Sequence, residues 1–165
     1  MQSEAAAEIL EVCILRGWRI ACAESLTGGL LADAFVSVPG ASRAFAGSLV
    51  IYDILEKERV LGVDGGTLKD RGAVEEEVAL QMALGAGRAF SPSPSPFLLL
   101  STTGVAGPDS DGFKPVGTVC CAALAPGSAP LLKTFHFSGS REEVRRSAVL
   151  GVLESALALL KSPLE

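Results

Sequence analysis

The sequence has few of the residues from which metal and acid–base sites are usually built. It contains one histidine, His136, and four cysteines, none of which form a CxxC pair. Structural zinc sites take Cys and His ligands in closely spaced pairs, so we expect no metal site. His136 lies in the alternating stretch FHF, which favours a structural histidine in a strand over a member of a Ser-His-Asp triad. The cysteines are expected to be buried, reduced thiols in a cytoplasmic protein.

The sequence also lacks an excess of positive charge and has no long apolar runs. The chain has 14 Lys and Arg against 19 Asp and Glu, which gives a net charge of −5. Because a phosphate backbone calls for a basic face, we expect no nucleic-acid partner. No apolar run approaches the roughly 18 residues of a membrane span, and the acidic start MQSEAAAEILEV lacks the basic region of a signal peptide. We therefore expect no membrane attachment.

The patterns that are present predict one α/β domain over residues 1–165. The length and a hydrophobic content of 48% allow a sizeable core. Hydrophobic periodicity predicts helices over 3–16, 27–37, 56–61, 74–90 and 140–161, and strands over 18–23, 44–52, 97–104, 116–124 and 131–137. This alternation predicts a three-layer α/β/α sandwich with a mixed, mostly parallel sheet, in which the last two strands form a hairpin.

Local signals refine two connections. Ser140, with Glu143 three residues later, predicts a capping box at the start of the last helix. The stretch 91-SPSPSP-96 cannot continue a helix and is expected to be an exposed surface loop.

Polar residues at three predicted strand ends indicate where a ligand would bind. Ligands of open α/β sheets lie beyond the carboxyl ends of the strands. That rule selects Glu24-Ser25, Tyr52 and the run Thr102-Thr103-Gly104.

The first of these ends, 24-ESLTGG-29, suits a nucleophile. Ser25 lies where a strand turns into a helix, and the glycines Gly28 and Gly29 let the backbone approach a ligand. A helix starting near Thr27 would point free N–H groups at an anion. The alternative is that Ser25 or Thr27 only caps that helix.

The other candidates are a base and two groups of ligand-binding residues. Lys57 follows Tyr52 by five residues and could activate a serine if its pKa is lowered; alternatively it is a solvated helix charge. The glycine-rich loop 103-TGVAGPDSDGFKPVG-117 contains Lys114. It is either a functional loop or an ordinary surface loop. Arg141 and Arg145 share a helical face that suits a phosphate, or they pair with neighbouring glutamates.

Together these stretches resemble the CinA C-terminal domain, the family of the nicotinamide mononucleotide (NMN) deamidases. The resemblance covers about residues 5–160, with order and spacing kept. Its matching stretches are AESLTGG (23–29), PGAS (39–42), GSLVIYDILEK (47–57), LGV (61–63), GAVEEEVA (72–79), TGVAGP (103–108), KPVG (114–117) and GSREEVRRSA (139–148).

The resemblance implies hydrolysis of the carboxamide of NMN to nicotinate mononucleotide and ammonia. It implies a cytoplasmic enzyme without metal or cofactor that forms a homo-oligomer, with a dimer favoured. Carried over by motif, the catalytic residues are Ser25, Lys57 and Tyr52. The substrate-binding residues would be Thr27, Gly28, Gly29, Thr103, Gly104, Lys114 and Arg141.

The chain also departs from the family pattern. Leu26 replaces a cysteine, the usual YSNEAK reads 52-YDILEK-57, and 109-DSDGF-113 places Phe113 where paired glutamates usually precede KPVG. The alternative to an amidohydrolase is therefore a catalytically silent nucleotide-binding protein, or a partner-binding protein associated with stress or competence.

Overall fold

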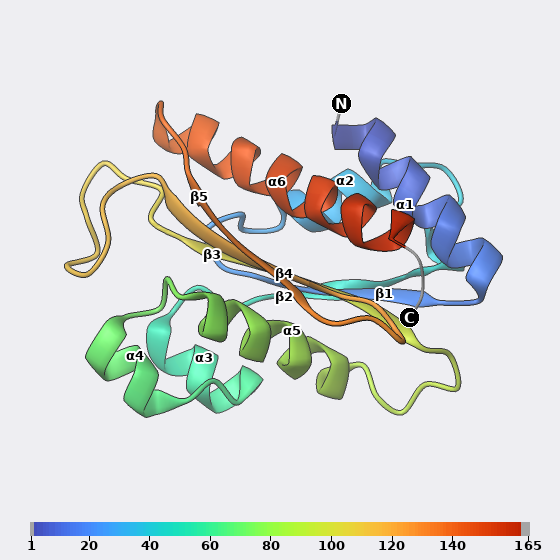
Figure 1. Cartoon of the computed structure of the whole chain (residues 1–165), viewed down its shortest axis with the longest axis horizontal. Coiled ribbons are helices and arrows are strands. Elements are labelled where there is room, and N and C mark those ends of the chain that lie inside the picture. Colours follow the sequence, from blue (N-terminus) through green and yellow to red (C-terminus); the bar gives the residue numbers. More distant parts are fainter. Residues whose placement is uncertain (1, 163–165) are drawn as a thin grey trace.

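A five-stranded sheet lies between two layers of helices (Figure 1). The computed structural model describes residues 2–162. The strands are β1 (Arg19–Glu24), β2 (Phe45–Val50), β3 (Phe97–Gly104), β4 (Thr118–Leu124) and β5 (Leu131–His136), arranged in the order β2-β1-β3-β4-β5. β1 and β2 precede the exposed 91–96 connection and the other strands follow it, so a single sheet joins both parts of the chain.

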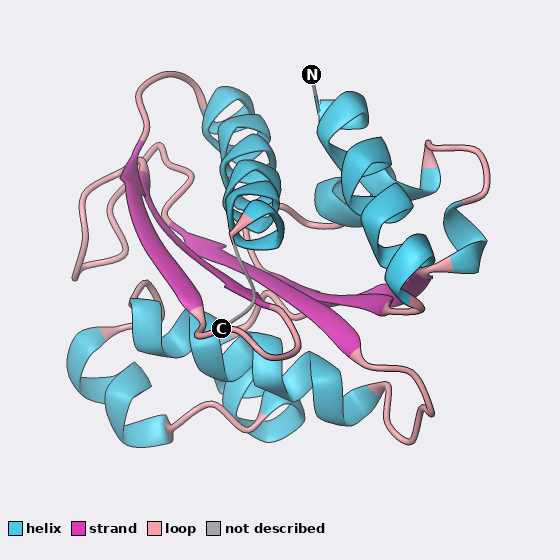
Figure 2. Cartoon of the chain, turned by 45° about the vertical axis from the view of Figure 1, so that its right-hand side comes forward, coloured by secondary structure: helices cyan, strands magenta, loops and turns pink. Residues whose placement is uncertain are grey.

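The helices divide between the two faces of the sheet, as the two views show (Figures 1 and 2). α1 (Gln2–Arg16), α2 (Leu30–Val36) and α6 (Arg141–Lys161) cover one face. α3 (Ile54–Leu61), α4 (Gly65–Arg71) and α5 (Glu76–Ala89) cover the other. A short 3₁₀ turn, η1 (Ala41–Arg43), leads into β2. This arrangement confirms the predicted three-layer α/β/α sandwich.

The strand directions confirm a mixed, mostly parallel sheet. β1 pairs in parallel with β2 and β3, while β4 is antiparallel to both β3 and β5. Only β4 therefore runs against the other strands, and β4 and β5 form the predicted hairpin. β1 is buried on both faces because helices cover both sides, which explains its continuous apolar run Ile20–Ala23.

Most helix ends follow from local chemistry. Ser140 and Glu143 form the predicted capping box at the start of α6. Asp53 caps α3 by accepting the N–H groups of Leu55 and Glu56, which starts that helix two residues before the predicted boundary. α4 was not predicted, because a seven-residue helix that begins with two glycines shows little apolar periodicity.

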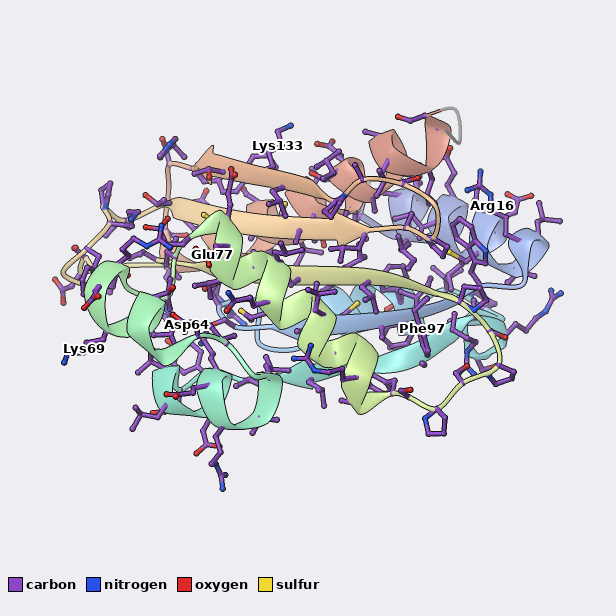
Figure 3. The ribbon with its side chains drawn as sticks, turned by 60° about the horizontal axis from the view of Figure 1, so that its bottom comes forward. Arg16, Asp64, Lys69, Glu77, Phe97 and Lys133 are labelled. Carbon is purple, nitrogen blue, oxygen red and sulfur yellow. The ribbon has the colours of Figure 1, made fainter. Side chains whose placement is uncertain are left out.

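The carboxyl ends of β1, β2 and β3 face the same end of the molecule. Figure 3 shows α5 lying across the sheet with α3 and α4 beside it. α5 contacts β1, β3 and β4, while α3 packs on α5. The helix that carries Lys57 is thereby held next to the end of β1. Within residues 2–162, the helices are all too short or too polar to cross a membrane.

Candidate active site

Ser25 and Lys57 meet at the end of β1. Lys57 Nζ lies 3.0 Å from Ser25 Oγ, although 32 positions separate the two residues. The strand delivers Ser25, whose N–H donates to the carbonyl oxygen of Thr102 on β3 at 3.0 Å. The first turn of α3 delivers Lys57 from the other side. The distance is within the hydrogen-bond reach that a nucleophile and its base require.

The Lys57 amine is buried among oxygen atoms. Its side chain is 2% exposed, and Nζ also donates to the carbonyl oxygens of Ile51 at 3.1 Å and Tyr52 at 3.0 Å. Burial lowers the pKa of Lys57 from an ordinary 10.5 to about 8, and the nearby carboxylate of Asp53 acts in the opposite direction. Of the two interpretations of Lys57, the solvated helix charge does not fit this buried amine.

In its charged form, Lys57 can donate one N–H group to each of these three oxygen atoms, and the neutral amine fits the same geometry. An uncharged lysine has two N–H donors and one lone pair, and Nζ faces two carbonyl oxygens and one hydroxyl group. The carbonyls can accept only, so they take the two N–H groups. The lone pair is then directed to the hydroxyl of Ser25, whose proton it can accept. The arrangement can therefore activate Ser25 without a histidine.

Residues from all three strand ends line one pocket, as the sequence predicted. The pocket has a volume of about 280 Å³, and its lining includes Ser25, Tyr52, Lys57, Thr103 and Gly104. Thr103 is buried, and its hydroxyl donates to the carbonyl oxygen of Ala73 at 2.9 Å. A Cβ on Gly104 would lie 2.8 Å from Val119 and 3.0 Å from Leu26, so this strand end requires glycine for close packing.

The prediction of a free anion cradle at the start of α2 is wrong. α2 begins at Leu30 rather than near Thr27, and the carboxylate of Glu24 accepts the N–H groups of Gly29, Leu31 and Ala32 at 2.9 to 3.2 Å. The same carboxylate accepts the hydroxyl groups of Thr27 and Ser48, both at 2.7 Å. Because the chain's own carboxylate occupies this helix end, no substrate anion can bind there.

Thr27, Gly28 and Gly29 therefore shape the turn rather than line the pocket. The side chain of Thr27 is fully buried between Glu24 and Thr102, so this side chain neither contacts substrate nor caps α2. Gly28 and Gly29 have positive φ angles of 54° and 101°, a conformation that favours glycine. Arg145 fixes the turn from α6 by donating to the carbonyl oxygens of Leu26 at 2.7 Å and Thr27 at 3.3 Å. Sequence reasoning gave neither Glu24 nor Arg145 this structural role.

Tyr52 lines the pocket, and Arg141 lies beside it. Arg141 donates to the Tyr52 hydroxyl at 2.9 Å and to the carbonyl oxygen of Gly107. The Tyr52 side chain is 64% exposed, so its hydroxyl remains accessible to a ligand. Within residues 2–162, neither Arg141 nor Arg145 forms an ion pair, whereas Arg146 pairs with Glu142 at 2.9 Å. The alternative that Arg141 and Arg145 pair with neighbouring glutamates is therefore wrong.

Lys114 lies near the pocket with its charge already paired. Its ammonium forms an ion pair with Glu75 at 2.6 Å, which ties the 105–117 loop to the start of α5. A paired, partly buried ammonium has less capacity to bind a second anion. Lys114 therefore positions the loop beside the pocket, and the prediction that it contacts substrate gains no support from this geometry.

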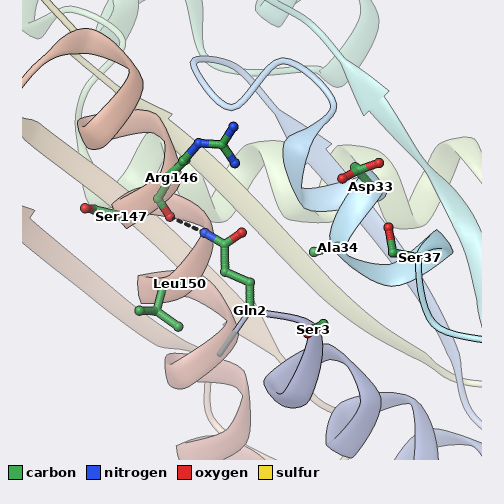
Figure 4. Close-up of a pocket in the computed structure, with 8 residues that line it drawn as sticks. All are labelled: Gln2, Ser3, Asp33, Ala34, Ser37, Arg146, Ser147 and Leu150. Carbon is green, nitrogen blue, oxygen red and sulfur yellow. Dashed lines mark hydrogen bonds between the residues drawn. The ribbon is translucent and has the colours of Figure 1, made fainter.

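A larger cavity lies away from Ser25. It has a volume of about 490 Å³ between α1, α2 and α6, and Figure 4 shows Gln2, Asp33 and Arg146 at its edge. Gln2 Nε2 donates to the carbonyl oxygen of Arg146 at 2.7 Å. None of the predicted site residues line this cavity. Across residues 2–162, no group of three His, Cys, Asp or Glu side chains is placed to hold a metal ion.

Comparison with known proteins decides the family. The model of the CinA C-terminal domain matches residues 2–162. The chain belongs to the CinA C-terminal domain family. The nicotinamide-nucleotide amidohydrolase PncC of Enterobacter agglomerans is 39% identical over 155 residues, which are 93% of this chain and 92% of that protein. A CinA-like protein of Fervidobacterium nodosum is 36% identical over 143 residues, 86% of this chain and 34% of that protein.

Solved structures of the CinA family agree with this fold. A CinA superfamily protein from Enterobacter cloacae has a TM-score of 0.90 at 28% identity, covering 98% of this chain and 93% of that one. A competence/damage inducible protein from Agrobacterium tumefaciens has a TM-score of 0.87 at 34% identity. The match covers 96% of this chain and 94% of that one. The chain thus spans nearly all of PncC but about a third of the CinA-like protein.

Proposed function

We propose that this CinA domain is an amidase that hydrolyses the carboxamide of NMN to nicotinate mononucleotide and ammonia. The observation that carries the proposal is the 3.0 Å contact between the buried Lys57 amine and the Ser25 hydroxyl at a pocket. The PncC relative, similar over nearly its whole length, supports this substrate.

In the first half of the proposed reaction, Ser25 attacks the amide carbon. Neutral Lys57 takes the hydroxyl proton, and a bond forms between Ser25 Oγ and the carbonyl carbon. The tetrahedral intermediate then breaks its C–N bond. The nitrogen leaves as ammonia with the proton that Lys57 received, and an ester on Ser25 remains. The Tyr52 hydroxyl, at the rim of the same pocket, can relay that proton.

In the second half, water cleaves the ester. Lys57 takes a proton from the water as the oxygen attacks the carbonyl carbon, and it returns the proton to Ser25 as the C–O bond breaks. The products are the carboxylic acid and the free enzyme, so one water is consumed for each ammonia released.

The negative charge on the intermediate needs donors close to Ser25. In strand-turn-helix elbows, the N–H group that follows the nucleophile supplies one. Within residues 2–162, the N–H groups of Leu26 and Thr27 form no hydrogen bond, whereas those of Gly29, Leu31 and Ala32 donate to Glu24. We assign the oxyanion-stabilising role to Leu26 and Thr27, where one such donor contributes about 3 kcal/mol.

The 5′-phosphate requires a cation beside the pocket. The Arg141 guanidinium has five N–H donors, of which two donate to the Tyr52 hydroxyl and the Gly107 carbonyl oxygen. Its remaining donors suit a phosphate, which arginine binds in a bidentate manner.

The test is ammonia release from NMN by the purified protein, with Ser25→Ala as the matched inactive variant. We expect turnover by the wild type and a loss of about a thousandfold or more in Ser25→Ala, with an unchanged melting temperature. Binding of NMN without ammonia release would instead favour a silent nucleotide-binding protein. Near wild-type turnover in folded Ser25→Ala would exclude Ser25 as the nucleophile.

A further inference from the structure

The exposed aromatic side chains of this protein gather at one place. The chain has one Trp, one Tyr and seven Phe. Within residues 2–162, only Tyr52 (64%) and Phe113 (49%) are exposed, and both line the pocket that contains Ser25 and Lys57. Exposing an aromatic ring to water has a cost, so two such rings at one small pocket point to a ligand that covers them.

The Phe113 ring is held in place despite its exposure. The Asp111 carboxylate accepts the N–H groups of Phe113 at 2.9 Å and Lys114 at 2.7 Å, and the ammonium of Lys114 pairs with Glu75. The ring lies against Gly72, where a Cβ would come within 2.7 Å of it. Gly72 also has a φ of 83°, which favours glycine. Phe113 therefore presents a fixed wall that needs no ordering when a ligand binds.

When Lys57 is neutral, as the proposed mechanism requires, Asp111 is the one charged group among the described residues that line the pocket. Asp111 lines the pocket, and within residues 2–162 only its Oδ1 oxygen accepts hydrogen bonds. The face of an aromatic ring carries a negative quadrupole potential, which attracts cations. A carboxylate and aromatic faces around one pocket thus favour a planar ring with a positive charge over a neutral or aliphatic group.

We propose that Phe113 is a specificity-determining residue, which binds the cationic ring of an N-substituted pyridinium amide and discriminates against uncharged and aliphatic amides. This inference rests on the proposed function in one respect, namely that the amide group lies against Ser25. The ring of the substrate then stacks on Phe113, with Asp111 near its positive charge.

A fluorescence experiment tests ring binding without any need for catalysis. The double variant Trp18→Phe/Phe113→Trp carries one indole, at the pocket wall, and the probe is 1-methylnicotinamide, a pyridinium amide without ribose or phosphate. We expect saturable quenching, because a pyridinium ring stacked on indole quenches its emission. Cyclohexanecarboxamide and neutral nicotinamide should displace the probe only at roughly tenfold or higher concentration.

The matched control moves the indole away from the pocket. Leu55 is 70% exposed and does not line the pocket, so Trp18→Phe/Leu55→Trp should show only linear, collisional quenching. Linear quenching in both double variants, or displacement of the probe by cyclohexanecarboxamide or nicotinamide at concentrations equal to that of the probe, would overturn the proposal.

Steady-state kinetics provide a second test of the role of Phe113. Phe113→Ala should raise KM for NMN roughly tenfold with kcat within about twofold, while Phe113→Tyr, which keeps the ring, should retain the wild-type KM. An unchanged KM in Phe113→Ala would also overturn the assignment. If the wild type releases no ammonia from NMN, the proposed function fails, and the quenching experiment still decides whether Phe113 binds a pyridinium ring.

Discussion

Lys57 Nζ reaches Ser25 Oγ because Asp53 starts a new helix directly after β2. The Asp53 carboxylate accepts the N–H groups of Leu55 and Glu56, and its carbonyl oxygen accepts that of Lys57 at 3.3 Å. This first turn directs the Lys57 side chain back over the end of the sheet, where two carbonyl oxygens and the Ser25 hydroxyl surround its amine. Asp53 is thus both the cap that positions the base and the charge that opposes the lowering of its pKa.

The pH dependence of the reaction should report the pKa of Lys57. With a pKa of about 8, roughly a tenth of the amines are neutral at pH 7, so kcat/KM for NMN should rise with pH and level off above about 8. Lys57→Arg is the matched variant, because a guanidinium stays charged over this range. We expect almost no ammonia release from it at any pH. Measurable activity with an unshifted profile would show that another group acts as the base.

The same pKa predicts a change in stability with pH. Unfolded Lys57 binds its proton up to about pH 10.4, whereas folded Lys57 releases it above about 8, so the unfolded state holds more protons in this window. The contribution of Lys57 to the free energy of unfolding should therefore rise between pH 8 and 10.5, by up to about 3 kcal/mol.

Buried cysteines act in the opposite direction, so the measurement must be a difference. Burial raises the pKa of Cys13 to about 12 and of Cys121 to about 11, which lowers stability once unfolded thiols ionise above about pH 8.5. The free energy of unfolding in urea is measured for the wild type and for Lys57→Met, at pH 8 and at pH 10. Because both proteins contain the same cysteines, the contribution of the cysteines cancels in the difference between the two proteins. A stability difference between the two proteins that stays constant with pH would contradict the lowered pKa.

The strand-end residues could be predicted from the sequence, whereas several of their contacts could not. Apolar runs that end in Ser25, Tyr52 and Thr103 place those residues at one edge of the sheet, because parallel strands share their direction. Local sequence could not show that Glu24 occupies the end of α2, since its contact with Ser48 depends on how β2 pairs with β1. Nor could it show the Lys114–Glu75 pair, whose partners lie 39 positions apart.

Glu24 should be the residue on which the nucleophile turn depends most. Its buried carboxylate accepts five hydrogen bonds, from two hydroxyl groups and three backbone N–H groups. In Glu24→Gln an amide group faces some of these donors, and we expect a loss of about 3 kcal/mol or more in the free energy of unfolding. Urea denaturation measures the loss. The exposed Glu142→Gln is the control and should be nearly neutral; equal effects of both variants would contradict this role of Glu24.

Arg141 should act on the phosphate and not on the amide. NMN and nicotinamide riboside carry the same amide and differ in the 5′-phosphate, so the two substrates separate the roles. Because a charge-assisted contact contributes about 1.5 to 3 kcal/mol, Arg141→Ala should raise KM for NMN roughly ten- to a hundredfold and leave KM for the riboside nearly unchanged. Arg146→Ala, which removes an exposed arginine paired with Glu142, is the control. Equal loss on both substrates in Arg141→Ala would show instead that Arg141 works through Tyr52, whose hydroxyl it contacts at 2.9 Å.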